Sequence, residues 1–239
     1  ITDTNSGYNA KDPYADRDPR LKAYILVNGD KIGSTDGVVN SAADSKTADG
    51  LNKENGKSTR TGYYLRKLLR SDINLNPNAT TKQKHLNARI RSTEILLDYA
   101  EAANEAQGPK ANVGGANYSA YDVIKAIRER AGLGEFGEDP YLEECAQTKH
   151  KMRELIRNER RLEVCFENHR FWDLRRWKAK LNEAAKGINI TTDEATGAFV
   201  YKTFDAEERK YDDHYMYYGP IPYSEILKYS NLKQNEGWK

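Results

Sequence analysis

The chain has 239 residues, of which 38% are hydrophobic and 31% are charged, a length that allows one large domain or two small ones. Lysine and arginine together number 38 and aspartate and glutamate 36, and the charges form no basic stripe of the kind that nucleic-acid-binding proteins carry. No run of 18 or more apolar residues occurs, so the sequence contains no candidate membrane-spanning helix.

The first 60 residues predict loops and turns rather than helices. Pro13 and Pro19 each disfavour a helical conformation in the residue before them, and the run AYILV after Leu21-Lys22 predicts a short strand. Residues 28–60 are rich in Gly, Asn, Asp and Ser, which predicts a long polar loop, and loops of such length are often functional. The chain opens without a signal peptide, and we expect its start to be the interior of a longer protein.

Two helices are predicted next. From Lys82 apolar residues recur every three or four positions until Gly108, which predicts the first helix. A second helix follows in SAYDVIKAIRERAG, where Ser119 and Asp122 resemble a capping pair. Two antiparallel helices joined by a loop indicate a unit of the tetratricopeptide kind, which needs neighbouring units to stack against.

The remaining elements are a third helix, a hairpin and a short terminal helix. The third helix is predicted from Tyr141, after Pro140, to beyond Arg161. INITTDEATGAFVYKTF contains two β-rich runs around a glycine-containing turn and predicts a hairpin. The short helix is predicted from about Ser224, before a turn-rich tail.

The stretch IRNERRLEVCFENHRFWDLRRWK places charged residues within an apolar stripe. At about 100° per residue, Glu159, Glu163 and Arg170 fall on the same helical face as Leu155. A buried carboxylate without a partner costs several kcal/mol, so both glutamates need cations or backbone donors from other elements. We therefore predict a structural ion network of Glu159, Glu163 and Arg170. Further candidate partners from the preceding helices are Arg89, Arg91, Arg128 and Arg130.

Two chemical alternatives exist for this stretch. Glu159 and Glu163 are a possible carboxylate pair for general acid–base catalysis, but no sign of a cleft surrounds them. Metal sites in helical bundles use Glu-x-x-His, whereas the nearest pattern here is Glu167-Asn-His169. We expect no catalytic residue, no metal and no cofactor.

At these residues the sequence resembles a known family. ERRLEVCFENHRFWDLRRWK resembles the helix signature of the SusD/RagB family of surface nutrient-binding lipoproteins, and YYGPIPYSEILKYSNLKQNEGW resembles its closing motif. DPYADRDPRL and TGYYLRKLL resemble two earlier segments of that family. The four motifs stand in the family's order from Asp12 to Trp238 and so cover most of the chain.

The resemblance implies a mainly α fold, a tetratricopeptide-like α-superhelix with long loops and a small β-hairpin. It implies a place on the outer membrane at the cell surface of Bacteroidetes-type bacteria, where the family serves polysaccharide utilization. The implied partners are a glycan or peptide ligand and a SusC-like TonB-dependent transporter. The motifs match the C-terminal half of a usual member, so the protein's own N-terminal half, with its expected lipid anchor, is a further implied partner.

Ligand contacts in the family come from variable loops. We therefore predict a loop-rich, ligand-facing segment over residues 1–81 and a helical region over residues 82–239, within one domain overall. Sugar rings suit exposed aromatic side chains, and sugar hydroxyls suit Asn and Lys. The candidate ligand-binding residues are Tyr8, Tyr14, Asn52 and Lys53. Trp172 and Trp177 are also able to stack on sugars, but their helix predicts packing.

Three functions remain in competition. The leading hypothesis is a non-enzymatic receptor that binds oligosaccharides for delivery to the transporter, with a peptide-binding, RagB-like receptor as a variant of it. The second is a glycoside hydrolase that uses Glu159 and Glu163. The third is a helical-repeat scaffold that binds a protein partner.

Overall fold

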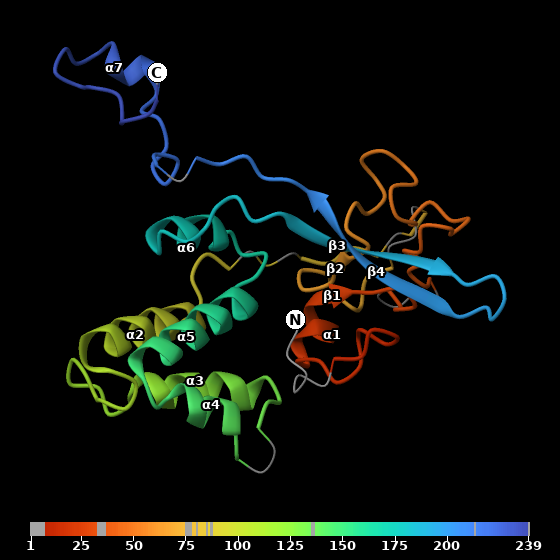
Figure 1. The fold of residues 1–239 in the computed structure, drawn as a ribbon, viewed down its shortest axis with the longest axis horizontal. Coiled ribbons are helices and arrows are strands. Elements are labelled where there is room, and N and C mark those ends of the chain that lie inside the picture. Colours follow the sequence, from red (N-terminus) through yellow and green to blue (C-terminus); the bar gives the residue numbers. More distant parts are fainter. Residues whose placement is uncertain are drawn as a thin grey trace. The chain divides into compact units, whose positions relative to one another are not determined.

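The structure is a computed structural model of the chain (Figure 1). The residues that it describes are 8–32, 37–74, 78–79, 81–84, 86, 88–134, 137–212 and 214–238. They form two compact units, a helical unit of Ile1–Ser41 with Tyr63–Phe166 and a hairpin unit of Ala42–Gly62 with Glu167–Lys239. The boundaries of these two units differ from the predicted division into residues 1–81 and 82–239. That division describes which segment faces the ligand, and it stays a prediction.

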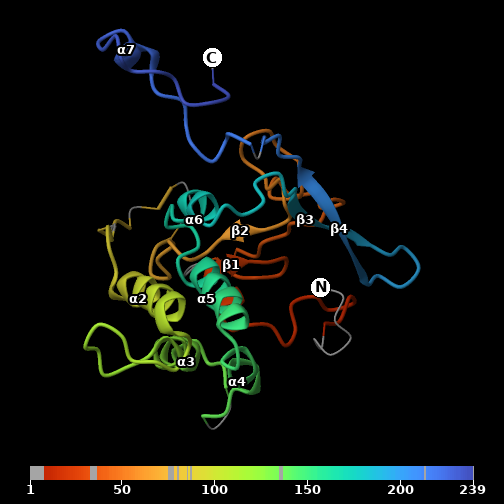
Figure 2. The ribbon, with the colours of Figure 1, turned by 60° about the vertical axis from the view of Figure 1, so that its left-hand side comes forward.

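The helical unit is built mainly from four helices that follow residue 90. Its described elements are α1 (Arg20–Tyr24), β1 (Ile25–Leu26), β2 (Tyr64–Leu65), α2 (Ser92–Gln107), α3 (Ala120–Arg130), α4 (Pro140–Cys145) and α5 (Lys149–Glu163). The two strands form a short antiparallel pair, and α2 lies beside both α3 and α5 (Figures 1 and 2). No helix in the described residues has the length and apolar character needed to cross a bilayer.

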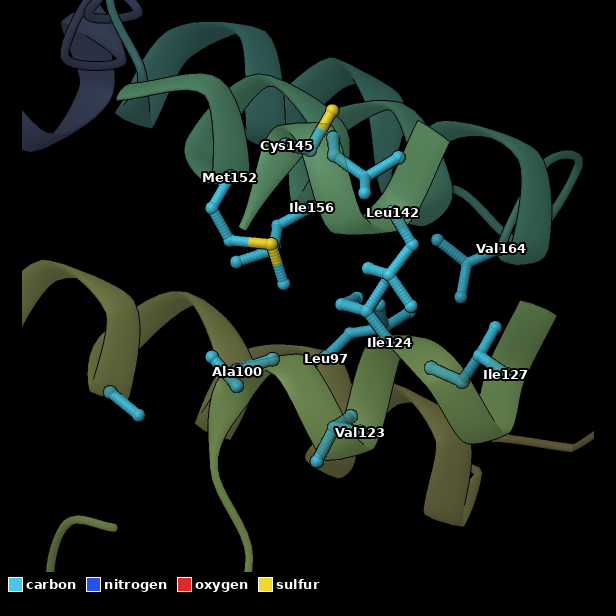
Figure 3. Close-up of a cluster of buried hydrophobic side chains, with 13 residues drawn as sticks. Leu97, Ala100, Val123, Ile124, Ile127, Leu142, Cys145, Met152, Ile156 and Val164 are labelled. Atoms are coloured by element: carbon cyan, nitrogen blue, oxygen red, sulfur yellow. The ribbon is translucent and has the colours of Figure 1, made fainter. Parts of the chain in front are cut away.

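The hydrophobic core of the helical unit lies among α2, α3, α4 and α5 (Figure 3). Leu97 of α2 and Ile124 of α3 are 0% exposed, and Leu155 of α5 is 1% exposed. In α2 the buried residues recur at the three- and four-residue spacing of one helical face, as Thr93, Leu97, Ala100 and Ala103 show. Burying one large aliphatic side chain stabilises the fold by about 1.5–3 kcal/mol, so this shared apolar face holds the helices together.

The predicted capping pair of the second helix is confirmed. The Ser119 hydroxyl accepts a hydrogen bond from the Asp122 backbone N–H, and the Asp122 carboxylate accepts one from the Ser119 backbone N–H at 2.8 Å. The two bonds satisfy donors that the first turn of a helix leaves unpaired, which fixes the start of α3.

Two predicted boundaries are wrong. The first helix starts at Ser92 rather than Lys82, because the backbone of Arg91 is extended. The two apolar residues that suggested the earlier start, Leu86 and Ile90, are 85% and 71% exposed, so no buried face supports a helix there. The predicted strand AYILV retains only β1, because α1 extends to Tyr24.

The predicted third helix is two helices, α4 and α5. The break between them follows from capping: the Thr148 side chain accepts a hydrogen bond from the Lys151 backbone N–H at 3.1 Å and begins α5. At the other end α5 stops at Glu163, and both Phe166 and Asn168 have positive φ angles, of 63° and 65°. Residues beyond Glu163 therefore do not continue its helical face.

The hairpin unit contains the predicted β-hairpin. Strands β3 (Ala185–Thr192) and β4 (Phe199–Glu207) pair in antiparallel register, with Ile190 opposite Tyr201 (Figure 1). The described part of the unit also contains α6 (Arg170–Arg176) and α7 (Tyr223–Ile226). Both the hairpin and the short terminal helix are thus confirmed.

The polar loop of residues 42–62 is attached to β3. The Ala43 backbone N–H donates to the Ile190 carbonyl at 2.8 Å, and the Ile188 N–H donates to the Thr61 carbonyl at 2.8 Å. At Gly62 the φ angle is 81°, and an added Cβ would lie 2.2 Å from the Ile188 carbonyl oxygen. Only glycine permits this close approach of the loop to β3. The loop therefore lies against the strand and is joined to it by backbone hydrogen bonds.

We predict that Leu97→Ala lowers the free energy of unfolding by about 2–5 kcal/mol, because it leaves a cavity in the core of the helical unit. Urea denaturation followed by circular dichroism measures the change. The matched control is Ile95→Ala on the same helix, whose side chain is 57% exposed and whose effect should stay within about 0.5 kcal/mol. Equal losses in the two variants would contradict the assignment of the core face.

Candidate functional site

The two glutamates of α5 are the most deeply buried charged side chains of the helical unit. Glu159 is 0% exposed and Glu163 is 2% exposed, and they lie one helical turn apart on the face that carries Leu155. Two adjacent buried carboxylates repel each other and lose their hydration, so their environment must supply positive charge.

Glu159 is held between two arginines. Arg20 Nη1 donates to Glu159 Oε2 at 2.8 Å, and Arg128 Nη1 donates to Glu159 Oε1 at 2.7 Å. Both carboxylate oxygens therefore accept charge-assisted hydrogen bonds, which are about twice as strong as neutral ones. Arg20 precedes Glu159 by 139 residues, so this contact joins the start of the chain to α5.

Each of these arginines also binds an aspartate. Arg20 contacts Asp18 through Nε and Nη2, with Nη2 2.6 Å from Oδ2, and Arg128 Nε lies 2.6 Å from Asp139 Oδ2. Charges thus alternate along a chain of five side chains, which we call the arginine–glutamate network: Asp18, Arg20, Glu159, Arg128 and Asp139. Asp139 in addition caps α4 by accepting a hydrogen bond from Leu142 N–H at 3.0 Å.

The network shifts the protonation of both aspartates. Burial favours a higher pKa for Asp18, but the hydrogen bonds and charge of Arg20 outweigh it and hold the pKa below its ordinary value of 3.8. At Asp139 burial is likewise outweighed, by Arg128 and by the backbone N–H of Leu142, and the pKa again lies below 3.8. Both carboxylates therefore keep their negative charge in the folded state.

Glu163 meets a second group of cations. Arg130 donates a hydrogen bond to its Oε1, Arg91 Nη1 lies 3.7 Å from the same oxygen, and Arg20 Nη1 lies 3.5 Å from Oε2. The Lys67 ammonium donates to the Glu163 backbone carbonyl at 2.6 Å. One carboxylate is thus shared by three guanidinium groups.

The structure brings together some of the residues that the sequence selected and separates others. Arg91, Arg128 and Arg130 lie beside the glutamates, whereas Arg170 is the first residue of α6 in the hairpin unit. Its predicted place on the helical face of Glu163 is wrong because α5 has already ended, and its share in an ion network stays a prediction. The long-range contact of Arg20 with Glu159 was not predicted, because the local sequence pattern holds no signal for it.

The predicted ligand residues in the helical unit are two tyrosines. Tyr8 is exposed, and the Arg17 guanidinium lies 5.6 Å from its ring centre. Tyr14 is half-buried and packs edge-on against Tyr63, with ring centres 6.4 Å apart. Tyr8 therefore presents an accessible aromatic ring, whereas much of Tyr14 serves packing.

The other two candidates, Asn52 and Lys53, lie in the loop of the hairpin unit and are both exposed. The backbone N–H of Asn52 donates to the Thr59 carbonyl at 2.9 Å, and its φ angle is 55°, which Asn tolerates better than most residues. The backbone of this turn is therefore ordered while both polar side chains face solvent.

An aromatic surface on α6 was not selected from the sequence. Trp172 is 66% exposed and Phe171 50% exposed, and their rings meet edge-on at 5.0 Å. The Arg175 guanidinium lies 3.5 Å from the ring centre of Phe171. The prediction that Trp172 packs in the interior is wrong, because α6 is a separate helix and its residues do not continue the buried face of α5. Trp177 is half-buried.

Metal ligation receives no support from the part of the chain that the structure describes. Within it, no group of three or more His, Cys, Asp or Glu side chains gathers in a geometry that would hold an ion. The only histidine singled out by sequence, His169, precedes α6 as its N-cap residue and makes no capping hydrogen bond through its side chain.

Comparison with known proteins places these features in a family. A model of the SusD family matches residues 1–238. SusD-like protein P2 of Formosa agariphila is 30% identical over 146 residues, which are 61% of this chain and 24% of that protein. The crystal structure of a SusD-like protein from Bacteroides fragilis has a TM-score of 0.69 at 28% identity, over 98% of this chain and 43% of that one.

A crystal structure of a SusD homologue from Bacteroides thetaiotaomicron gives a TM-score of 0.51 at 21% identity, over 92% of this chain and 41% of that one, which shows likeness of fold alone. The predicted fold class, mainly helical and tetratricopeptide-like with a small hairpin, is confirmed by these likenesses. The chain spans less than half the length of these relatives.

We predict that Glu159→Gln lowers the free energy of unfolding by about 3–5 kcal/mol, because it leaves Arg20 and Arg128 buried beside a neutral amide. Chemical denaturation gives this value directly. Glu154→Gln on the same helix is the control: Glu154 is exposed and pairs with Arg157 at 3.3 Å, and its removal should cost no more than about 1 kcal/mol. Indistinguishable midpoints for the two variants would refute a stabilising role of the network.

The lowered pKa values of Asp18 and Asp139 predict acid sensitivity. Because each pKa is lower in the folded state than in the unfolded state, their contribution to stability is fully present above the ordinary value of 3.8 and is lost as pH falls through the folded value. Unfolding free energies measured from about pH 5 down to about pH 2 should therefore decrease. Asp18→Asn should reduce that slope, and an unchanged slope would argue against Asp18 as a source.

Proposed function

This chain belongs to the SusD family, and we propose that it binds oligosaccharides at the cell surface without catalysis and delivers them to a SusC-like TonB-dependent outer-membrane transporter. The family match over residues 1–238 is the observation that carries the proposal. The chain corresponds to less than half of its relatives, so the remainder of the protein, with a lipid anchor, is part of the proposed assembly.

The geometry of the arginine–glutamate network supports binding over hydrolysis. A glycoside hydrolase needs one carboxylic acid that gives up a proton and one carboxylate that meets the sugar or a water molecule. Both oxygens of Glu159 accept hydrogen bonds from arginines, and Glu163 is shared by three. Carboxylates held in this way are buried counter-ions, and we propose that they serve architecture.

Loop residues are the proposed ligand contacts. The exposed ring of Tyr8 offers a flat apolar surface for a sugar ring, while the Asn52 amide and the Lys53 ammonium offer hydrogen bonds to hydroxyls. Tyr14 contributes what remains accessible of its ring. Loops are suited to this task because the backbone beneath them is fixed while their side chains face solvent.

The test is isothermal titration calorimetry of the chain against a panel of neutral oligosaccharides. We expect heat with at least one glycan, and a loss of affinity of about tenfold in Lys53→Ala, the effect of removing one charge-assisted hydrogen bond. Lys46→Ala is the matched control, since Lys46 is an exposed lysine of the same loop region and should bind as the parent chain does.

Other outcomes would select the competing functions. Heat with peptides but with no glycan would indicate a RagB-like peptide receptor. Release of reducing sugar that disappears in Glu163→Gln would indicate a hydrolase. Capture of the transporter without any small-ligand affinity would indicate a protein-binding scaffold.

A further inference from the structure

A pocket of about 310 Å³ lies within the helical unit, beside Glu163. Pro19, Ala23 and Ala131 supply its apolar wall, and its polar groups come from Tyr24, from Glu163 and from the arginines at positions 20, 91 and 130. A few convergent polar groups on an apolar wall, in a volume near the lower end of ligand pockets, are typical of a site for one small ring.

Arg130 is the side chain of this pocket with unused binding capacity. A guanidinium carries five N–H donors. Arg130 donates two hydrogen bonds, one to the Thr93 hydroxyl at 3.1 Å and one to the Glu163 carboxylate. Its side chain is 55% exposed, so the remaining donors are accessible from solvent. Among the described residues Arg130 has Glu163 as its counter-ion, and it shares that carboxylate with Arg20 and Arg91.

Arg20 cannot serve a ligand in the same way, since its guanidinium is buried between Asp18 and Glu159. It does fix the Glu163 carboxylate from the other side, at 3.5 Å. The positive potential at the pocket wall therefore comes from Arg130 and its neighbour Arg91, and it favours an anionic group.

Tyr24 provides the second recognition element. Its ring is half-buried, and the Lys67 ammonium lies 4.3 Å from the ring centre, a cation–π contact on one face of the ring. In the described part of the chain its hydroxyl forms no hydrogen bond, so the hydroxyl is able to pair with a polar group in the pocket. An aromatic ring and an arginine fork that line the same pocket suit a sugar ring that bears a carboxylate.

We infer that this pocket binds the carboxylate of an acidic sugar, with Arg130 as the group that recognises the anion and Tyr24 as the group that contacts the ring. The planar guanidinium matches a carboxylate through two parallel hydrogen bonds, a geometry that an ammonium cannot reproduce. The inference rests on the proposed function only in taking the ligand to be a saccharide, and it adds a binding pocket within the helical unit that is distinct from the proposed loop contacts.

The test compares galacturonate with galactose, which differ in the carboxylate, by calorimetry at constant ionic strength. Galacturonate should bind and galactose should not bind at this pocket. In Arg130→Gln the affinity for galacturonate should fall about tenfold or more, since one charge-assisted pair is removed. Arg153→Gln is the control, because Arg153 pairs with Glu105 and does not line the pocket.

Sodium sulfate is the third ligand in the experiment. Sulfate binding as tight as that of galacturonate, with the same sensitivity to Arg130→Gln, would overturn the inference in favour of a general anion site. Galacturonate binding that Arg130→Gln leaves unchanged would also overturn it, as would no binding at all. If Arg130→Gln fails to fold by circular dichroism, Arg130→Lys keeps the charge but removes the planar fork, and its affinity should again fall.

The test of the acidic-sugar pocket and the test of the proposed receptor function can fail independently of each other. Binding of neutral oligosaccharides that depends on Lys53 tests the receptor, whereas binding of galacturonate that depends on Arg130 tests the pocket. Loss of the second with retention of the first would reject the acidic-sugar site and leave the receptor in place.

Discussion

The buried carboxylate of Glu159 is the interaction on which the helical unit depends. It accepts hydrogen bonds from Arg20, near the start of the chain, and from Arg128 of α3, and each arginine is balanced by an aspartate. Removing such charges from water costs several kcal/mol per ion, and only close pairing offsets the cost. The network therefore connects the initial turns to α3, α4 and α5.

The same arrangement explains why the charged signature of α5 favours a structural role over a chemical one. Its glutamates are surrounded by guanidinium groups, and exposed polar and aromatic side chains lie on loops, on α6 and, at Arg130, beside Glu163. In the hairpin unit, backbone hydrogen bonds to β3 hold the loop of residues 42–62 in place beneath its exposed side chains. Under the proposed function, the buried charges of α5 belong to the helical framework and the loop residues contact the ligand.

The sequence by itself determined the elements whose signals are local. The capping residues Ser119 and Asp122 set the start of α3, and alternating β-rich runs around a turn set the hairpin of β3 and β4. The burial of Glu159 and Glu163 also followed from the sequence, since helical periodicity alone places them on the face of Leu155. These features depend on residues within a few positions of one another, where spacing and propensity are sufficient.

Only the tertiary structure decided which groups meet across long separations and which faces stay exposed. Arg20 and Glu159 are 139 residues apart in the sequence, and the tertiary fold brings them into contact. No local sequence pattern predicts that contact. The end of α5 at Glu163 moves Arg170 onto another helix and leaves Trp172 at the surface, against the helical phase expected from sequence. The physical reason is that periodicity predicts which side of a helix is apolar, whereas partners, breaks and exposure depend on how separate elements pack.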